Sequence, residues 1–302
     1  MASDFEAQVR ATNDRINAQV RATNEKINAR TGRPLVRALV VGTALGLALL
    51  FSLIFVKELF MVFAIVLIAF TTVELATALR FGGRYVPRIP TAIAAIAVVP
   101  AAFYWGATGH WLVTLAGVAI IGIWRLAALI RPSARAGGMT VLKDLAAGAF
   151  IMTYVAFMAS FTVLLTAQDG GQWWTLAFLI IVISVDTGAY ASGLAFGRHK
   201  MAPTISPGKT WEGFAGSVVV AMIAGVLLAI LMLQQPWWVG VILGLTMVAT
   251  ATLGDLAESL IKRDLGIKDM STWLPGHGGF LDRVDSSLLS AAATYALFLL
   301  FT

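Results

Sequence analysis

Residues 59–79 read LFMVFAIVLIAFTTVELATAL, an apolar run whose one charged side chain, Glu74, lies near its end. A helix that crosses the hydrocarbon core of a bilayer needs about 17 to 25 predominantly apolar residues. Hydrophobic residues make up 59% of the 302-residue chain, above the share of about 45–50% that is typical of soluble domains. The sequence therefore predicts an all-α, polytopic membrane protein.

Similar apolar runs occur about nine times along the chain. The third of them is short and contains Pro100, which favours a kink, and the fourth contains Arg125 near its end. We expect membrane-spanning helices at residues 36–56, 59–79, 91–105, 111–130, 145–166, 173–194, 214–233, 237–254 and 286–301.

Basic residues indicate how these helices are oriented. With nine crossings, all of the 22 Lys and Arg residues except Lys57 fall on one side of the membrane. Because cytoplasmic loops carry an excess of Lys and Arg, we expect the N-terminus in the cytoplasm and the C-terminus outside, in the plasma (inner) membrane. Six tryptophans lie at the ends that this topology makes external, where amphipathic rings prefer the interface: Trp105, Trp111, Trp173, Trp174, Trp237 and Trp238.

The remaining composition narrows the function. A net charge of +6 does not indicate nucleic-acid binding, because basic residues of a polytopic protein chiefly mark its cytoplasmic loops. Cysteine is absent and histidine occurs three times, so any metal site must be built from oxygen ligands. The N-terminus lacks the pattern of a removable signal peptide.

Ionisable residues gather between positions 255 and 285, beside two long apolar runs. Such charges are costly next to hydrocarbon unless they meet a metal, a phosphate or each other. Asp255, Ser259 and Lys262 share one helix face, and Asp282 and Asp285 follow a glycine-rich turn. Oxygen ligands, cations and free backbone amides suit Mg²⁺-assisted phosphoryl transfer. The segment therefore predicts a phosphate-handling site on a membrane face, and solvated ion pairs in a loop are the alternative.

A second polar segment covers residues 186–212. Asp186 falls inside the sixth apolar run, where a carboxylate serves a metal, a polar substrate group or a hydrogen bond between helices. The sequence GKT around Lys209 is not a P-loop, because Pro203 stands where that motif requires glycine. Three basic residues remain candidate phosphate contacts: Lys209, Arg198 and Lys200.

Glu74, inside the second run, is a weaker candidate. It is expected either to pair with Arg80 or Arg125 between helices or to line a path for lipid.

These segments resemble the phosphatidate cytidylyltransferase (CDP-diacylglycerol synthase) family. DTGAY at Asp186 and SPGKTWEG from Ser206 resemble family blocks. The main family signature is S-x-x-K-R, four residues, K-D, then P-x-H-G-G and D-R-x-D. The chain supplies every position of it: Ser259, Lys262, Arg263, Lys268, Asp269, Pro275, His277, Gly278, Gly279, Asp282, Arg283 and Asp285.

The resemblance implies an enzyme that transfers the cytidylyl group from CTP to phosphatidic acid, releasing pyrophosphate, at a cytoplasm-facing site with Mg²⁺. It implies metal ligands at Asp255 and Asp282. We expect Asp285 and Asp186 to support or complete this metal site, and a second cation stays open. We expect the catalytic residues to be Asp255, Asp282, Lys262, Asp186 and His277. We expect Lys209, Arg263, Ser259, Gly278, Gly279 and Arg283 to bind substrate.

Two other functions compete with this interpretation. A polyprenol kinase shares the use of CTP and is the alternative enzyme, whereas the constellation of a CDP-alcohol phosphotransferase is not found. A transporter would use Asp186, Glu74 and Arg125 as an ion path, but it also requires an internal repeat of spans, which we do not find.

The N-terminal segment carries a repeat outside this resemblance. Residues 9–19, VRATNDRINAQ, recur at 20–30 as VRATNEKINAR. Eleven residues make close to three helical turns, so the apolar residues form one narrow stripe. We expect residues 1–30 to be a helical cytoplasmic extension of a membrane-embedded catalytic domain, residues 31–302. A solvated extension and a helix for self-association, as in a homodimer, both stay open.

Overall fold

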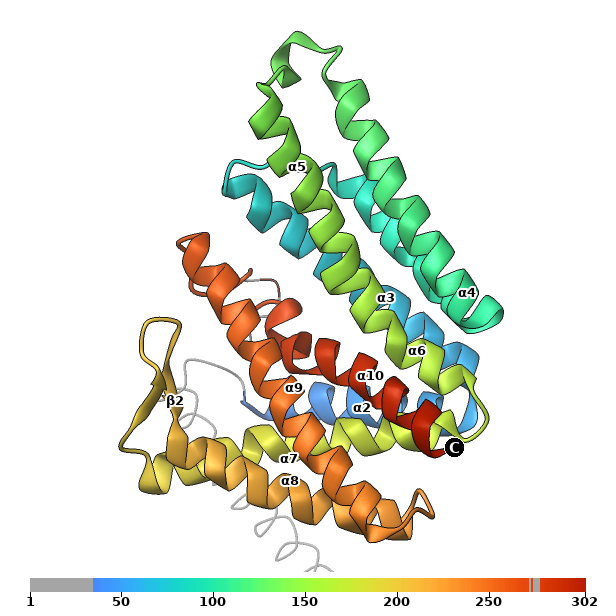
Figure 1. The fold of residues 1–302 in the computed structure, drawn as a ribbon, viewed down its shortest axis with the longest axis vertical. Coiled ribbons are helices and arrows are strands. Elements are labelled where there is room, and N and C mark those ends of the chain that lie inside the picture. The colour runs from blue at the N-terminus through green and yellow to red at the C-terminus, as the bar shows by residue number, and fades with distance from the viewer. Residues whose placement is uncertain (1–34, 272, 274–277) are drawn as a thin grey trace, which may run out of the picture. The chain divides into compact units, whose positions relative to one another are not determined.

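The computed structural model describes residues 35–271, 273 and 278–302 (Figure 1). The chain forms two units, Met1–Phe51 and Ser52–Thr302. Of the first unit, the described part is the beginning of helix α2 (Leu35–Phe55). The 11-residue repeat, and with it the question of self-association through residues 1–30, lies outside the described residues.

The second unit is built almost entirely of helices, which confirms the predicted class. Among the described residues, seven helices are long and apolar enough to cross a membrane. α5 and α6 form one of these, because the π-helical segment η2 joins them without a break. The helices are α3 (Lys57–Phe81), α4 (Arg88–Ala128), α5 (Gly138–Ile151), η2 (Met152–Phe157), α6 (Met158–Ala167), α7 (Gly171–Phe196), α8 (Trp211–Leu231), α9 (Trp237–Asp264) and α10 (Leu281–Phe301), with a short 3-10 turn at Pro132–Ala134.

Helix α4 folds back on itself at Gly106, whose φ of 62° and ψ of −151° are not helical. A Cβ on Gly109 would lie 2.6 Å from the carbonyl oxygen of Ala101, although an unbroken helix would separate these residues by about 12 Å. The predicted runs at 91–105 and 111–130 are therefore the two arms of one helical hairpin. The reversal lies at glycine and not at Pro100, because glycine adopts this backbone conformation without strain.

A two-stranded antiparallel β-hairpin, which the sequence analysis did not predict, joins α7 to α8. Its strands are β1 (Lys200–Ala202) and β2 (Ser206–Thr210). Arg263 near the end of α9 donates through Nε to the carbonyl oxygen of Ile205 at 3.2 Å. This contact attaches the turn of the hairpin to α9.

A large core of the second unit lies where α7, α8, α9 and α10 pack together (Figure 1). Its buried side chains include Phe178, Leu243 and Met247. α8 and α9 approach so closely that a Cβ on Gly240 would lie 2.5 Å from the carbonyl oxygen of Gly225. Within a bilayer, close packing of this kind drives helix association, because lipid tails are as apolar as the side chains. The crossing fixes α8, and with it the end of the β-hairpin, against α9.

Gly240→Ala is expected to destabilise the fold, because the new methyl group would meet backbone atoms that cannot rotate away. Overpacking of this kind costs about 1–3 kcal/mol, which thermal unfolding in detergent would show as a lower midpoint. Gly122→Ala is the matched control, since its Cβ would lie 3.7 Å from the Leu145 side chain, an ordinary contact. Equal midpoints for the two variants would contradict the close crossing.

Candidate active site

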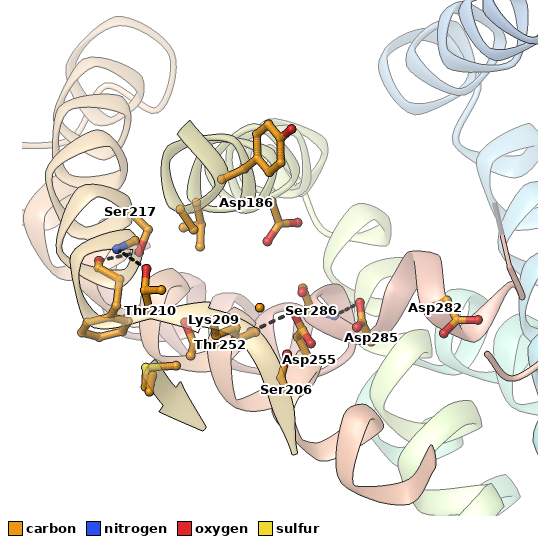
Figure 2. A pocket seen from close by; sticks show the side chains of 17 residues that line it. Asp186, Ser206, Lys209, Thr210, Ser217, Thr252, Asp255, Asp282, Asp285 and Ser286 are labelled. Atoms are coloured by element: carbon orange, nitrogen blue, oxygen red, sulfur yellow. Dashed lines mark hydrogen bonds and ion pairs between the residues drawn. The ribbon is translucent and has the colours of Figure 1, made fainter. Parts of the chain in front are cut away.

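A cavity of about 430 Å³ lies between α7, α8, α9, α10 and β2 (Figure 2). Its lining includes four carboxylates, from Asp186 on α7, Asp255 on α9, and Asp282 and Asp285 on α10. The ammonium group of Lys209 joins them from β2. Acids and a lysine from both polar segments of the sequence therefore meet at one cavity.

Lys209 reaches from the β-hairpin to α9. Its Nζ lies 2.7 Å from Oδ2 of Asp255, and both side chains are only partly exposed. The hydroxyl of Ser259, one turn along α9, donates to Oδ1 of Asp255 at 3.3 Å. Asp255 is thus held between a cation and a hydroxyl group at the edge of the cavity.

Asp285 comes close to Asp255 because α9 and α10 touch at Gly254. A Cβ on Gly254 would lie 2.4 Å from the carbonyl oxygen of Asp285, so a larger residue would separate the two helices. The Asp285 carboxylate accepts the backbone N–H of Ser286 at 2.7 Å. Asp186 faces the same space from α7 (Figure 2). The carboxylates of Asp186, Asp255 and Asp285 repel one another. The cavity therefore carries negative charge that one lysine offsets only in part.

Asp282 has a different environment from the other three acids. Its carboxylate accepts from Nζ of Lys262 at 2.7 Å, and from the N–H groups of Gly279 at 2.7 Å and Met270 at 3.2 Å. Lys262 also pairs with Glu258, which is fully buried. These bonds tie the segment before α10 to α9.

The acids suit a divalent cation that is held jointly with a substrate. Within the described residues, no group of three acidic or histidine side chains is arranged to hold a metal ion by itself. Mg²⁺, however, commonly binds through one or two carboxylates and completes its shell with water and substrate phosphates. Asp255, Asp285 and Asp186 offer such oxygen ligands around one cavity. That Asp282 shares the ion stays a prediction, and Figure 2 shows its carboxylate turned away from Asp186 and Asp255.

Several residues that were predicted to act in catalysis or to bind substrate are not part of the cavity lining. Lys262 is engaged by two carboxylates, and Arg263 binds the β-hairpin. Gly278 has a φ of 78°, which favours glycine, and it shapes the turn before Asp282. His277 falls outside the described residues. The predicted site residues that the structure describes but does not place in the lining are Ser259, Lys262, Arg263, Gly278, Gly279 and Arg283.

The cavity also contains hydroxyl groups that the sequence analysis missed. Thr210 caps helix α8, since its Oγ1 accepts the N–H of Gly213 at 3.1 Å. A threonine directly before a helix is an N-cap signal that could have been recognised. Ser217 and Thr252 are isolated polar residues in apolar surroundings, which a single sequence does not separate from packing residues. Tyr190, Ser206 and Ser286 lie in or beside the polar segments, among charged residues that carry stronger signals. The missed hydroxyl-bearing residues are Tyr190, Ser206, Thr210, Ser217, Thr252 and Ser286.

Glu74 pairs with neither of the two arginines proposed for it. Arg125 instead forms a buried ion pair with Asp144, with Nε 2.7 Å from Oδ2. Arg80 donates to the carbonyl oxygen of Val86 at 3.1 Å. The Glu74 carboxylate accepts backbone N–H groups at the start of α10. Glu74 therefore connects two helices, as one of the two expectations stated, but its partner is the start of α10 and not an arginine.

Comparison with known proteins identifies the family. Residues 36–301 match the cytidylyltransferase family. The chain belongs to this family. It is 41% identical over 277 residues to the phosphatidate cytidylyltransferase of Mycobacterium bovis, which covers 88% of this chain and 89% of the relative. The enzyme of the same name from Mycobacterium tuberculosis shows the same identity over 83% of its length. That of Brucella suis is 42% identical over 151 residues, 50% of this chain and 55% of the relative. The resemblance inferred from the sequence motifs is confirmed.

Asp285→Asn is expected to raise the thermal midpoint of this cytidylyltransferase in the absence of divalent cations. The substitution removes one of three mutually repelling charges, an effect on the order of 1 kcal/mol. Mg²⁺ should raise the midpoint of the unaltered protein saturably and that of the variant by less. Asp169→Asn, at an exposed loop position, is the control. A lower midpoint of Asp285→Asn without metal, or an undiminished response to Mg²⁺, would contradict this account of the site.

Proposed function

We propose that this protein transfers the cytidylyl group of CTP to phosphatidic acid, giving CDP-diacylglycerol and pyrophosphate in phospholipid biosynthesis. Membership of the family over residues 36–301 supports this, as do relatives named phosphatidate cytidylyltransferase at 41% identity over 88% of the chain. The structural observation that carries the proposal is the cavity in which Asp186, Asp255 and Asp285 meet Lys209.

In this reaction a phosphate oxygen of phosphatidic acid forms a bond to the α-phosphorus of CTP. The bond from that phosphorus to the oxygen of the β-phosphate breaks, and pyrophosphate leaves with the electron pair. The attacking phosphate is already ionised, so a strong general base is not needed. The main difficulty is to bring two polyanions together in line, and positioned cations reduce that difficulty.

Lys209 is the cation best placed to contact a phosphate. It lies in the cavity lining and pairs with Asp255. A phosphate oxygen of the substrate can take the place of the Asp255 carboxylate, so that the ammonium group of Lys209 always has a partner. Arg263 holds the turn of the β-hairpin to α9 and so keeps Lys209 over the cavity. Lys262 acts indirectly, by fixing Asp282 and the segment before α10.

The proposal includes Mg²⁺, held by Asp255, Asp285 and Asp186 together with substrate phosphates, and Asp282 stays a further predicted ligand. Bound Mg²⁺ neutralises phosphate charge. The three acids present oxygen ligands from three different helices, which fixes where a cation and its phosphates can lie. A triphosphate and a lipid phosphate add further negative charge, so a second cation, monovalent or divalent, belongs to the proposal as well.

We further propose nine membrane crossings, with the N-terminus in the cytoplasm and the C-terminus outside. The two arms of α4, joined at Gly106, count as two of these crossings. The β-hairpin with Lys209 then faces the cytoplasm at the plasma (inner) membrane, on the side where CTP is found. The distribution of Lys and Arg supports this orientation.

CTP labelled at its α-phosphate tests the reaction on protein in detergent with short-chain phosphatidic acid and Mg²⁺. We expect the label in the lipid product, and we expect Asp255→Asn to lower turnover about 100-fold or more. Asp169→Asn, in a loop outside the cavity, should keep normal turnover. A lipid kinase would instead move the γ-phosphoryl group. Transfer of label from γ-labelled CTP but not from α-labelled CTP would overturn the proposal.

Single cysteines test the orientation, because the natural chain contains none. Lys200 on β1 and Asp169 between α6 and α7 are both exposed. In intact cells a membrane-impermeant maleimide should label Asp169→Cys, and it should label Lys200→Cys only after the membrane is opened. The reverse pattern would place the cavity on the external face.

A further inference from the structure

Helix α3 contacts the segment that leads into α10, although the two are far apart in the sequence. Phe70 stacks on Phe280 with ring centroids 4.8 Å apart, and it meets Trp273 edge-on at 5.9 Å. Glu74 lies one turn after Phe70, on the same face of α3. One face of α3 therefore holds both the segment and the start of α10.

Glu74 is buried, with 1% of its surface exposed. Its Oε2 accepts the N–H of Leu281 at 2.7 Å, and its Oε1 accepts the N–H of Phe280 at 3.2 Å. Ser271 also donates its hydroxyl to Oε1. A Cβ on Gly279 would lie 2.1 Å from Oε1, so the carboxylate fits only beside a glycine. Both oxygens of the Glu74 carboxylate therefore accept hydrogen bonds, from the segment before α10 and from the first residue of α10.

A carboxylate suits this position for two physical reasons. The first turn of a helix has amide groups without partners in the helix, and Glu74 accepts from the first of them. Its negative charge also interacts favourably with the positive end of the helix dipole. Glutamine would be a poor substitute, because its amide nitrogen is a donor and would face another N–H donor. Glu74 thus acts as the cap of α10, supplied by a different helix.

The start of α10 determines where two of the acids lie. Asp282 directly follows Leu281 and accepts the N–H groups of Gly279 and Met270. Asp285 comes about one turn later and lines the cavity. If the first turn of α10 moved, Asp285 would move with it relative to α9.

We infer that Glu74 is a positioning residue for the cytidylyl transfer: from α3 it fixes the first turn of α10 and thereby the place of Asp285 at the cavity. The inference rests on the proposed function. Glu74 is not among the described residues that line the cavity, so it acts through α10 and not by contact with substrate.

The test combines kinetics with a spectroscopic signal from the segment itself. The protein is labelled with 5-fluorotryptophan, and Trp273→Phe assigns the ¹⁹F resonance of Trp273 among the nine tryptophans. Glu74→Gln is compared with Glu58→Gln, an exposed glutamate on the same helix. Turnover is measured with α-labelled CTP and phosphatidic acid over a range of concentrations of each.

For Glu74→Gln we expect a shifted or broadened Trp273 resonance and a kcat lower by about 10- to 100-fold, the usual effect of losing a residue that orients active-site acids. KM for CTP should change little, because the binding lysine is not touched. Glu58→Gln should match the unaltered protein in both measurements. Ser271→Ala, which removes one of the three donors, should shift the same resonance and lower kcat by a smaller factor.

Two results would overturn the inference: an unchanged Trp273 resonance in Glu74→Gln, or a shifted resonance with normal kcat. Should Glu74→Gln fail to fold, the kcat of Ser271→Ala decides, and a normal value would overturn the inference. The Trp273 resonance does not decide in that variant, because Ser271 also accepts the N–H of Trp273 at 3.3 Å. Absence of lipid labelling by the unaltered protein is a separate outcome, which would remove the proposed function and with it the catalytic part of this inference.

Discussion

Close contact between α9 and α10 at Gly254 is the constraint on which the site depends. With only 2.4 Å between a Cβ there and the carbonyl oxygen of Asp285, the two backbones can meet only at glycine. This contact brings Asp255 and Asp285 to one cavity, while Asp186 approaches from α7. Acids gathered in this way repel one another, so the helices must be held by packing elsewhere, such as the α8–α9 crossing at Gly225 and Gly240. Repulsion among the acids lowers the stability of the fold, and packing between the helices offsets that loss.

The two lysines of the site have different physical roles. Lys209 stands on a β-hairpin and pairs with one partly exposed carboxylate, so a phosphate oxygen can replace that partner at little cost. Lys262 lies between Glu258 and Asp282, and its removal would leave carboxylates without a counter-ion in a buried place. The first arrangement suits exchange with a substrate, and the second suits a permanent join between α9 and the segment before α10.

Particular elements show how far the sequence could predict this protein. Run length and composition predicted the helices, including both arms of α4, because crossing hydrocarbon requires a local stretch of apolar residues. The β-hairpin was missed, since β1 and β2 are short and carry no apolar alternation to mark them. The motifs identified the family and included the acids that line the cavity. They did not separate Asp282, held by Lys262 and backbone amides, from Asp255 and Asp285.

The sequence by itself determined that this chain is a helical membrane protein of the cytidylyltransferase family, because hydropathy and motif residues are properties of contiguous stretches. Only the tertiary structure decided which charges meet. Glu74 looked like a partner for an arginine, yet it receives the amides at the start of α10, 207 positions later. Its partner depends on which helices pack side by side, and that follows from the sum of many weak contacts between distant segments. No local pattern in the sequence records that sum.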